Sequence, residues 1–131
     1  MQDNPTALQI LDTVITHLRE RLLPTLEGRA IWETRVTISA LELVRREFNL
    51  KPASDAAELG RLSALLGETG ALETLNERLC AAISGGVIDT STPGLLEHLH
   101  ATAIEKLAVD QPNYGAYKLA IASDTRPPRH P

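Results

Sequence analysis

The chain has 131 residues, an apolar fraction of 43% and a formal net charge of −4. This length suits one domain with a single hydrophobic core, which needs neither a metal ion nor a disulfide for support. Acidic and basic residues are interspersed and no basic face forms, so we expect neither nucleic acid nor a membrane as a partner. Because only four residues are aromatic, the core must consist of Leu, Ile, Val and Ala, which favours closely packed helices.

The N-terminus carries no pattern typical of a targeting segment. No Lys or Arg precedes its apolar residues, and Asp12 and His17 interrupt them, so we do not expect a signal peptide. No apolar run approaches the roughly 20 residues of a membrane-spanning helix. Cys80 is the single cysteine, which excludes an intramolecular disulfide. These features together predict a bacterial, cytoplasmic protein.

Two helices are predicted in the first part of the chain. Asn4 and Pro5 resemble a helix cap and a first helical position, so the first helix is expected over 5–23, with Pro24 ending or kinking it. Its apolar residues recur at helical spacing: Leu8, Leu11, Ile15, Leu18 and Leu22. A second helix is expected over 29–48. Since this helix is apolar around more than one stripe, we expect it to be central, with neighbours on two sides.

A linker is predicted at residues 51–53, because Pro52 interrupts the helical pattern. Asp55, followed three positions later by Glu58, resembles a capping box and predicts a third helix from there to residue 66. After the turn at 67–70, a fourth helix carries one apolar stripe: Leu72, Leu75, Leu79 and Ile83. The third and fourth helices should therefore form an αα-hairpin.

A fifth helix is predicted from Thr92 and Pro93 to a point near Asp110, because Pro112 forces an end there. Its buried side is expected to hold Leu96, Leu99, Ala103 and Leu107. The sequence thus predicts an all-α, single-domain bundle of about five helices over residues 1–115. Residues 116–131 are expected to form a C-terminal arm or tail without regular structure.

Reactive side chains do not combine into a catalytic or metal-binding pattern. His98 and His100 would project about 200° apart on a helix, so they cannot share a metal ion and are expected at the surface or edge of the helix. Cys80 adjoins a core position and is expected to be a small buried residue. No serine or cysteine has the context of an activated nucleophile. We therefore predict no catalytic residue, metal or cofactor, which favours a non-catalytic protein and leaves activity open.

Charged residues on two of the helices form the candidate site. Arg29 with Glu33 and Glu42 with Arg46 have the spacing of solvated i,i+4 pairs. If the second helix is covered on two sides, however, its arginines need a carboxylate or a ligand anion. Asp110 lies at a helix C-terminus, where the helix dipole disfavours a negative charge. An internal Arg–Asp network and an anion pocket both remain open for this candidate cluster: Arg29, Arg35, Arg46, Lys106, Asp110 and Tyr114.

Several segments together resemble a known bacterial family. These are LLPTLEGRAIWETRV, ALELVRREF, the leucine-rich hairpin and HLHATAIEKLAVDQPNY. The most specific pieces are the LEGR turn, Arg35-Val36, Arg46-Glu47 and the ending K-L-x-x-D-x-P-x-Y at 106–114. From about residue 3 to residue 115 the chain resembles the family catalogued as domain of unknown function 6285.

The resemblance implies a metabolic context. Members of that family tend to be encoded beside, or fused to, kinases similar to aminoglycoside phosphotransferases, and beside acyl-CoA dehydrogenases. The first functional hypothesis is therefore an accessory or interaction module in fatty or hydroxy acyl-CoA metabolism, with such a kinase or dehydrogenase as partner. The alternative is a small protein that binds acyl-CoA, phosphate or carboxylate through the candidate cluster. A second copy of the chain is a further expected partner.

Overall fold

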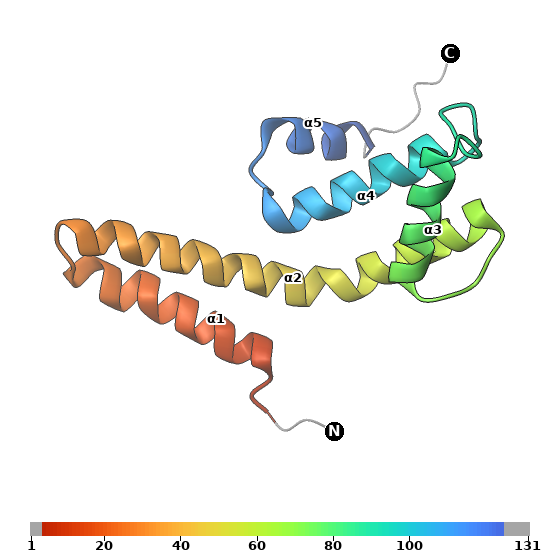
Figure 1. Cartoon of the computed structure of the whole chain (residues 1–131). Helices are drawn as coiled ribbons and strands as arrows, with labels where there is room; N and C mark the ends of the chain where they lie inside the picture. Colours follow the sequence, from red (N-terminus) through yellow and green to blue (C-terminus); the bar gives the residue numbers. More distant parts are fainter. Residues whose placement is uncertain (1–3, 125–131) are drawn as a thin grey trace, which may run out of the picture. The chain divides into compact units, whose positions relative to one another are not determined.

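The computed structural model describes residues 4–124, which form helices joined by turns and contain no strand (Figure 1). This confirms the all-α prediction. The helices are α1 (Ala7–His17), α2 (Arg29–Leu66), α3 (Leu72–Ser84), α4 (Leu95–Asp110) and α5 (Gly115–Asp124). The chain divides into two compact units, Met1–Lys51 and Pro52–Pro131. Among the described residues, no helix has both the length and the apolar character needed to cross a membrane.

The first helix begins at Thr6 rather than at Asn4. The Thr6 side chain accepts a hydrogen bond from the Gln9 backbone N–H at 3.3 Å, while the Thr6 backbone N–H donates to Gln9 Oε1 at 2.7 Å. This capping box satisfies two N–H groups that the helix leaves unpaired, so it sets the start of α1. The chain then continues through a π-helical turn, Leu18–Leu22, and a 3-10 turn, Leu23–Thr25. The predicted helix over 5–23 is thus interrupted earlier than expected: α1 ends at His17, and Pro24 lies inside the 3-10 turn that ends this helical run at Thr25.

In the first unit, α1 is paired with the part of α2 that precedes Pro52. Ile15 on α1 and Ile38 on α2 are the buried residues of this helix pair, with 3% and 5% of their surface exposed. By contrast, Trp32 is 64% exposed and Phe48 62% exposed. The prediction that the helix over 29–48, now the first part of α2, is covered on two sides is therefore wrong for the described chain. One partner helix covers only one stripe of α2, and its other apolar side chains stay in contact with solvent.

The predicted linker at 51–53 and the predicted cap at Asp55 are also wrong, because α2 runs through both. Pro52 lies inside the helix. A proline keeps a φ compatible with a helix but has no N–H, so the helix can continue with one backbone hydrogen bond missing. The boundary between the two units along the chain nevertheless falls between Lys51 and Pro52. The proline thus marks a boundary between units without interrupting the helix.

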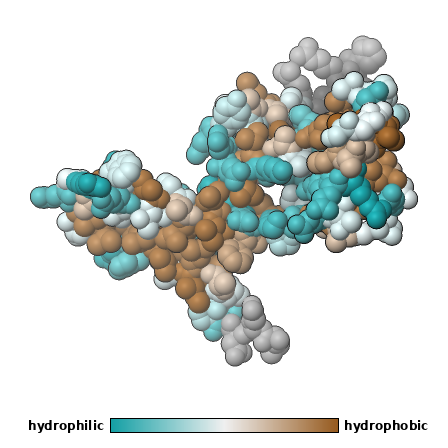
Figure 2. Space-filling view, viewed as in Figure 1, coloured by the Kyte–Doolittle hydropathy of each residue, from teal (hydrophilic) through white to brown (hydrophobic). Residues whose placement is uncertain are grey.

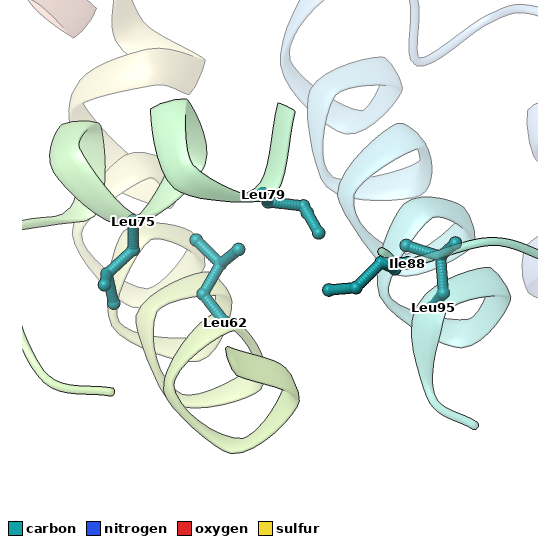
Figure 3. Packing of buried hydrophobic residues seen from close by; sticks show 5 residues of the cluster. All are labelled: Leu62, Leu75, Leu79, Ile88 and Leu95. Atoms are coloured by element: carbon teal, nitrogen blue, oxygen red, sulfur yellow. The ribbon is translucent and has the colours of Figure 1, made fainter. Parts of the chain in front are cut away.

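The core of the second unit lies between the end of α2, α3 and the start of α4 (Figure 3). Leu62 on α2 and Leu75 on α3 are fully buried. Around them pack the other buried members, Leu79, Ile88 and Leu95, and the partly buried Leu59, Leu65, Leu66, Leu72 and Ala82. The predicted αα-hairpin is confirmed, and an ion pair between Glu68 and Arg78 links its turn to α3.

The buried face of α4 differs from the prediction. Leu95 and His98 are each 3% exposed, whereas Leu96 is 54% and Leu99 44% exposed. Gly94, in the left-handed conformation with φ 88°, is the N-cap that precedes the helix. Leu95 then enters the core directly, which sets the rotation of α4 about its axis. Further along α4, the same face carries the polar residues His98, Thr102 and Glu105. The apolar pattern of the sequence did not indicate this face.

The chain remains helical after Tyr114, as α5, so the predicted irregular tail does not begin at residue 116. α5 contacts α4. The rest of the predicted tail, 125–131, lies outside the described residues.

Candidate functional site

In the second unit, a partly buried ion pair joins α2 to α4. Arg61 donates from Nη1 to Glu105 Oε1 at 2.9 Å and from Nη2 to Glu105 Oε2 at 2.6 Å. Nη2 also reaches Thr102 Oγ1 at 3.4 Å. The two charged side chains are 26% and 24% exposed, so solvent screens this pair only in part. The hydrogen bonds to Glu105 raise the pKa of Arg61, against the opposing effect of burial.

Three further residues extend this contact. Asn76 on α3 donates from Nδ2 to Glu58 Oε1 at 2.8 Å. His98 lies buried on α4, and neither its Nδ1 nor Arg61 Nε has a hydrogen-bond partner among the described residues. We call this set the α2–α4 polar cluster: Glu58, Arg61, Asn76, His98, Thr102 and Glu105. Its members come from three helices, and its direct bonds connect α2 with both of the others.

The surroundings of His98 favour its neutral form. Burial lowers the pKa of His98 most, and the positive charge of Arg61 lowers it further. The carboxylates of Glu58 and Glu105 act in the opposite direction but do not outweigh these two effects. An imidazole placed in this way supplies a neutral polar group beside a guanidinium that is already bound to a carboxylate. The main role of the α2–α4 polar cluster is therefore to hold α3 and α4 against α2.

The residues of the predicted cluster fall in two different units. Arg29 and Arg35 are exposed on α2, and Arg29 binds Glu33 at 2.7 Å as predicted. Arg46 is half-buried on the same helix. Lys106 and Asp110 are exposed on α4, and Tyr114, 52% exposed, follows it. The grouping of all six in one site stays a prediction, and within the first unit the neighbours of Arg46 form a recess of their own.

That recess has a volume of about 290 Å³. Its lining comes from α1 and α2: Leu8, Asp12, Arg45, Arg46, Asn49 and Leu50. Arg45 Nη1 binds Asp12 Oδ1 there at 3.0 Å. A second recess, of about 400 Å³, lies between α4 and α5. His100, Glu105 and Ser123 are its polar lining residues.

Two expectations about reactive side chains are wrong. His98 is buried rather than at the surface, because it shares a face of α4 with Leu95. Cys80 is exposed, because it follows the buried Leu79 and so points about 100° away from the core. Within the described residues, no group of three or more His, Cys, Asp or Glu side chains could hold a metal ion.

Sequence reasoning missed Arg61 and Glu105 entirely. One signal could have indicated the latter: His98, Thr102 and Glu105 recur at i, i+4 and i+7, which is the spacing of one helix face. Arg61 carries no comparable signal. It precedes Leu62, and a charged residue next to an apolar one on a helix is normally expected to face solvent while its neighbour is buried. The partner 44 positions away is visible only in the fold.

Comparison with known proteins agrees with the segments noted in the sequence. No curated protein and no solved structure matches the chain significantly. A family model described as Domain of unknown function (DUF6285) matches residues 24–114. The matched region contains the whole of α2, α3 and α4, and with them the α2–α4 polar cluster. Because it covers more than half of the chain, this protein belongs to the DUF6285 family.

Proposed function

We propose that this protein is a non-catalytic accessory module that docks onto an enzyme of acyl-CoA metabolism. The expected partner is an acyl-CoA dehydrogenase or a kinase similar to aminoglycoside phosphotransferases. The metabolic context comes from the family resemblance of the sequence. Support for a docking role comes from the surface of α2, and in particular from one aromatic side chain.

Trp32 carries this proposal. It is the single tryptophan of the chain and is 64% exposed. Val36, one helical turn further along α2, is 48% exposed and lies on the same face. Tryptophan is among the residues that most often contribute the binding energy of protein interfaces, because it buries a large rigid surface. Solvent exposure of this pair on one helix face is what a docking surface requires.

The surroundings of Trp32 suit a polar rim. Arg29 and Arg35 are exposed within one turn of it, and the Arg29–Glu33 ion pair is open to solvent. Interfaces commonly place such charged residues around a central apolar anchor, where they orient the partner. The position lies inside the region matched by the family model. We call Trp32 and Val36 the α2 outer face.

Direct binding measurements would test this proposal. The dehydrogenase and the kinase encoded in the same genome would be purified and immobilised in turn. The accessory module would then be titrated onto each by surface plasmon resonance. Trp32→Ala should weaken binding by more than about tenfold, the effect of a central aromatic anchor.

Phe48→Ala is the matched control. Phe48 is as exposed as Trp32, but it lies 16 positions away and so projects about 160° from it around the α2 axis. Its substitution should leave affinity for the enzyme unchanged. Failure of both purified enzymes to bind the unaltered protein would contradict the proposal. Equal effects of the two substitutions would show that the α2 outer face is not the docking surface.

The recess around Arg46 supports a second candidate function, binding of a small phosphate or carboxylate compound such as an acyl-CoA. Arg45, Arg46 and Asn49 bring hydrogen-bond donors to one recess, and guanidinium groups suit such anions. Thermal-shift measurements with CoA, acyl-CoA and inorganic phosphate would test this. A specific ligand should raise the melting temperature with concentration, and Arg46→Met should remove the shift. A flat response to all three compounds would contradict it.

A further inference from the structure

The recess between α4 and α5 lies on helices that carry none of the residues of the α2 outer face. Both helices belong to the second unit and contact each other directly (Figure 1). The volume of the recess is about 400 Å³, within the range of roughly 300–1,000 Å³ that is typical of small-molecule sites. We call it the α4–α5 recess. Its size is therefore compatible with a small ligand.

Apolar side chains form one part of its lining. They are Ala101 and Ile104 on α4 and Ala120 and Ile121 on α5. The alanines leave space between the helices, and the isoleucines provide apolar surface for contact. Figure 2 shows apolar side chains interspersed with hydrophilic ones over the second unit. An occupant of the α4–α5 recess therefore needs an apolar body as well as a polar group.

Glu105 brings hydrogen-bond acceptors to the same recess. Its two carboxylate oxygens accept from Arg61 at 2.9 and 2.6 Å. A carboxylate has about four lone-pair positions, and the two bonds to Arg61 use only half of them. The Glu105 side chain also remains 24% exposed. Each of its oxygens can therefore accept a further hydrogen bond from a ligand.

The other polar lining residues also present acceptors. Ser123 donates its hydroxyl hydrogen to the Ala120 carbonyl oxygen at 2.7 Å, so the hydroxyl oxygen is left to accept. A neutral imidazole, as at His100, has one nitrogen that accepts and one that donates. Among the described lining residues, none is Lys or Arg. Acceptors thus outnumber donors around this recess, and a suitable ligand must supply donors.

An ammonium group meets this requirement, because it has three N–H donors and no acceptor. Its positive charge is attracted by the Glu105 carboxylate, whereas an anion would be repelled by it. We propose that the α4–α5 recess binds a small organic amine. Its ammonium group donates to Glu105 and Ser123, and its apolar body packs against Ile104 and Ile121. This ligand is opposite in charge to the one considered for the recess around Arg46.

Three probes of one chain length separate the contributions of charge and apolar body: hexylamine, hexan-1-ol and hexanoate. Each would be titrated into the full-length, isotope-labelled chain and followed by ¹H–¹⁵N NMR. Hexylamine has about seven non-hydrogen atoms, so we expect a dissociation constant of about 1 mM. Its saturable shifts should include the amides of Ala101, Ala120 and Ser123. Hexan-1-ol should bind at least about tenfold more weakly, because its hydrogen bond carries no charge, and hexanoate should not shift these amides.

Ala101→Leu places additional side-chain atoms in the recess and should weaken hexylamine binding by at least about tenfold. Ala103→Leu is the matched control, since residue 103 is exposed on the same helix and does not line the recess. This variant should keep the affinity of the parent. Leucine is a good helix former, so both variants should retain the helical circular dichroism. Ser123→Ala, at an exposed position, removes one acceptor and should weaken binding by about three- to tenfold.

Three results would overturn the proposal. The first is the lack of saturable shifts at the recess amides with hexylamine up to about 20 mM, some twenty times the expected dissociation constant. The second is binding of hexanoate at these amides as tightly as hexylamine. The third is equal affinity for hexylamine in Ala101→Leu and Ala103→Leu. None of these measurements involves a protein partner, so their outcome is independent of the docking role.

Discussion

Arg61 and Glu105, 44 positions apart in sequence, meet through two hydrogen bonds of 2.9 and 2.6 Å. Each nitrogen faces its own carboxylate oxygen, so the contact is bidentate, a geometry that fixes orientation as well as distance. It joins the end of α2 to the middle of α4. Glu105 lies on the same face of α4 as the buried Leu95 and His98, so the ion pair holds that face towards α2, and it leads to the first prediction.

Removal of the carboxylate should destabilise the protein. Glu105→Ala leaves a partly buried guanidinium without its main acceptor, and we expect the free energy of unfolding to fall by about 2 kcal/mol. Urea denaturation followed by far-UV circular dichroism measures this change. Glu33→Ala is the control: its partner Arg29 is 86% exposed, so the loss should stay below about 0.5 kcal/mol. Equal losses would show that the α2–α4 contact does not stabilise the fold.

The neutral state of His98 predicts a pH dependence. Burial and the charge of Arg61 lower the pKa of His98 in the folded protein below its ordinary value. The unfolded chain therefore binds the proton first as the pH falls, and stability should decline from about pH 6.5 downwards, through the lowered pKa of the folded state. Above about pH 6.5 this residue should contribute no slope.

Substitution separates this effect from other titrations. Charged side chains face His98 from two helices, Glu58 and Arg61 on α2 and Glu105 on α4. His98→Leu should flatten the decline in unfolding free energy between about pH 6.5 and 5. His100→Gln, at an exposed position of the same helix, should retain it. A slope identical in all three proteins would disprove the assignment.

Neighbouring leucines at the start of α4 test its orientation. Leu95 is 3% exposed and packs in the core, whereas Leu96 is 54% exposed. Leu95→Ala should lower the free energy of unfolding by about 2–5 kcal/mol, because it leaves a cavity. Leu96→Ala should change it by less than about 0.5 kcal/mol. Thermal and urea unfolding of the two variants gives a direct comparison, and the reverse order would mean that the opposite face is buried.

Pro52 should destabilise α2. A proline inside a helix removes one backbone hydrogen bond and costs up to about 3 kcal/mol relative to alanine, part of which is offset by the stiffer unfolded chain. Pro52→Ala should therefore raise the free energy of unfolding by about 1–2 kcal/mol and increase the helical signal. Lys51→Ala, at the preceding exposed position, is the control. A loss of stability on Pro52→Ala would contradict this prediction.

Local patterns determined most of the helices. The stripe of Leu72, Leu75, Leu79 and Ile83 predicted the second helix of the αα-hairpin, because apolar side chains at helical spacing share a face wherever the helix lies. Pro24 indicated that the first helical run stops in its neighbourhood, and this run ends at Thr25, but the end of α1 at His17 had no such signal. The segments that resemble the DUF6285 family were likewise visible in the sequence, and the match over residues 24–114 agrees with them.

Tertiary structure decided what the local patterns left open. The rotation of α4 could not be predicted, because Leu95 and Leu96 are equally apolar and only contact with the α2–α3 hairpin selects one. α2 passes through Pro52 because a helix tolerates one missing hydrogen bond, whereas the sequence pattern alone favoured an end. Local spacing thus determined the helices and their periodicity. Contacts between residues distant in sequence, above all Arg61 with Glu105, decided which faces are buried and which remain for partners.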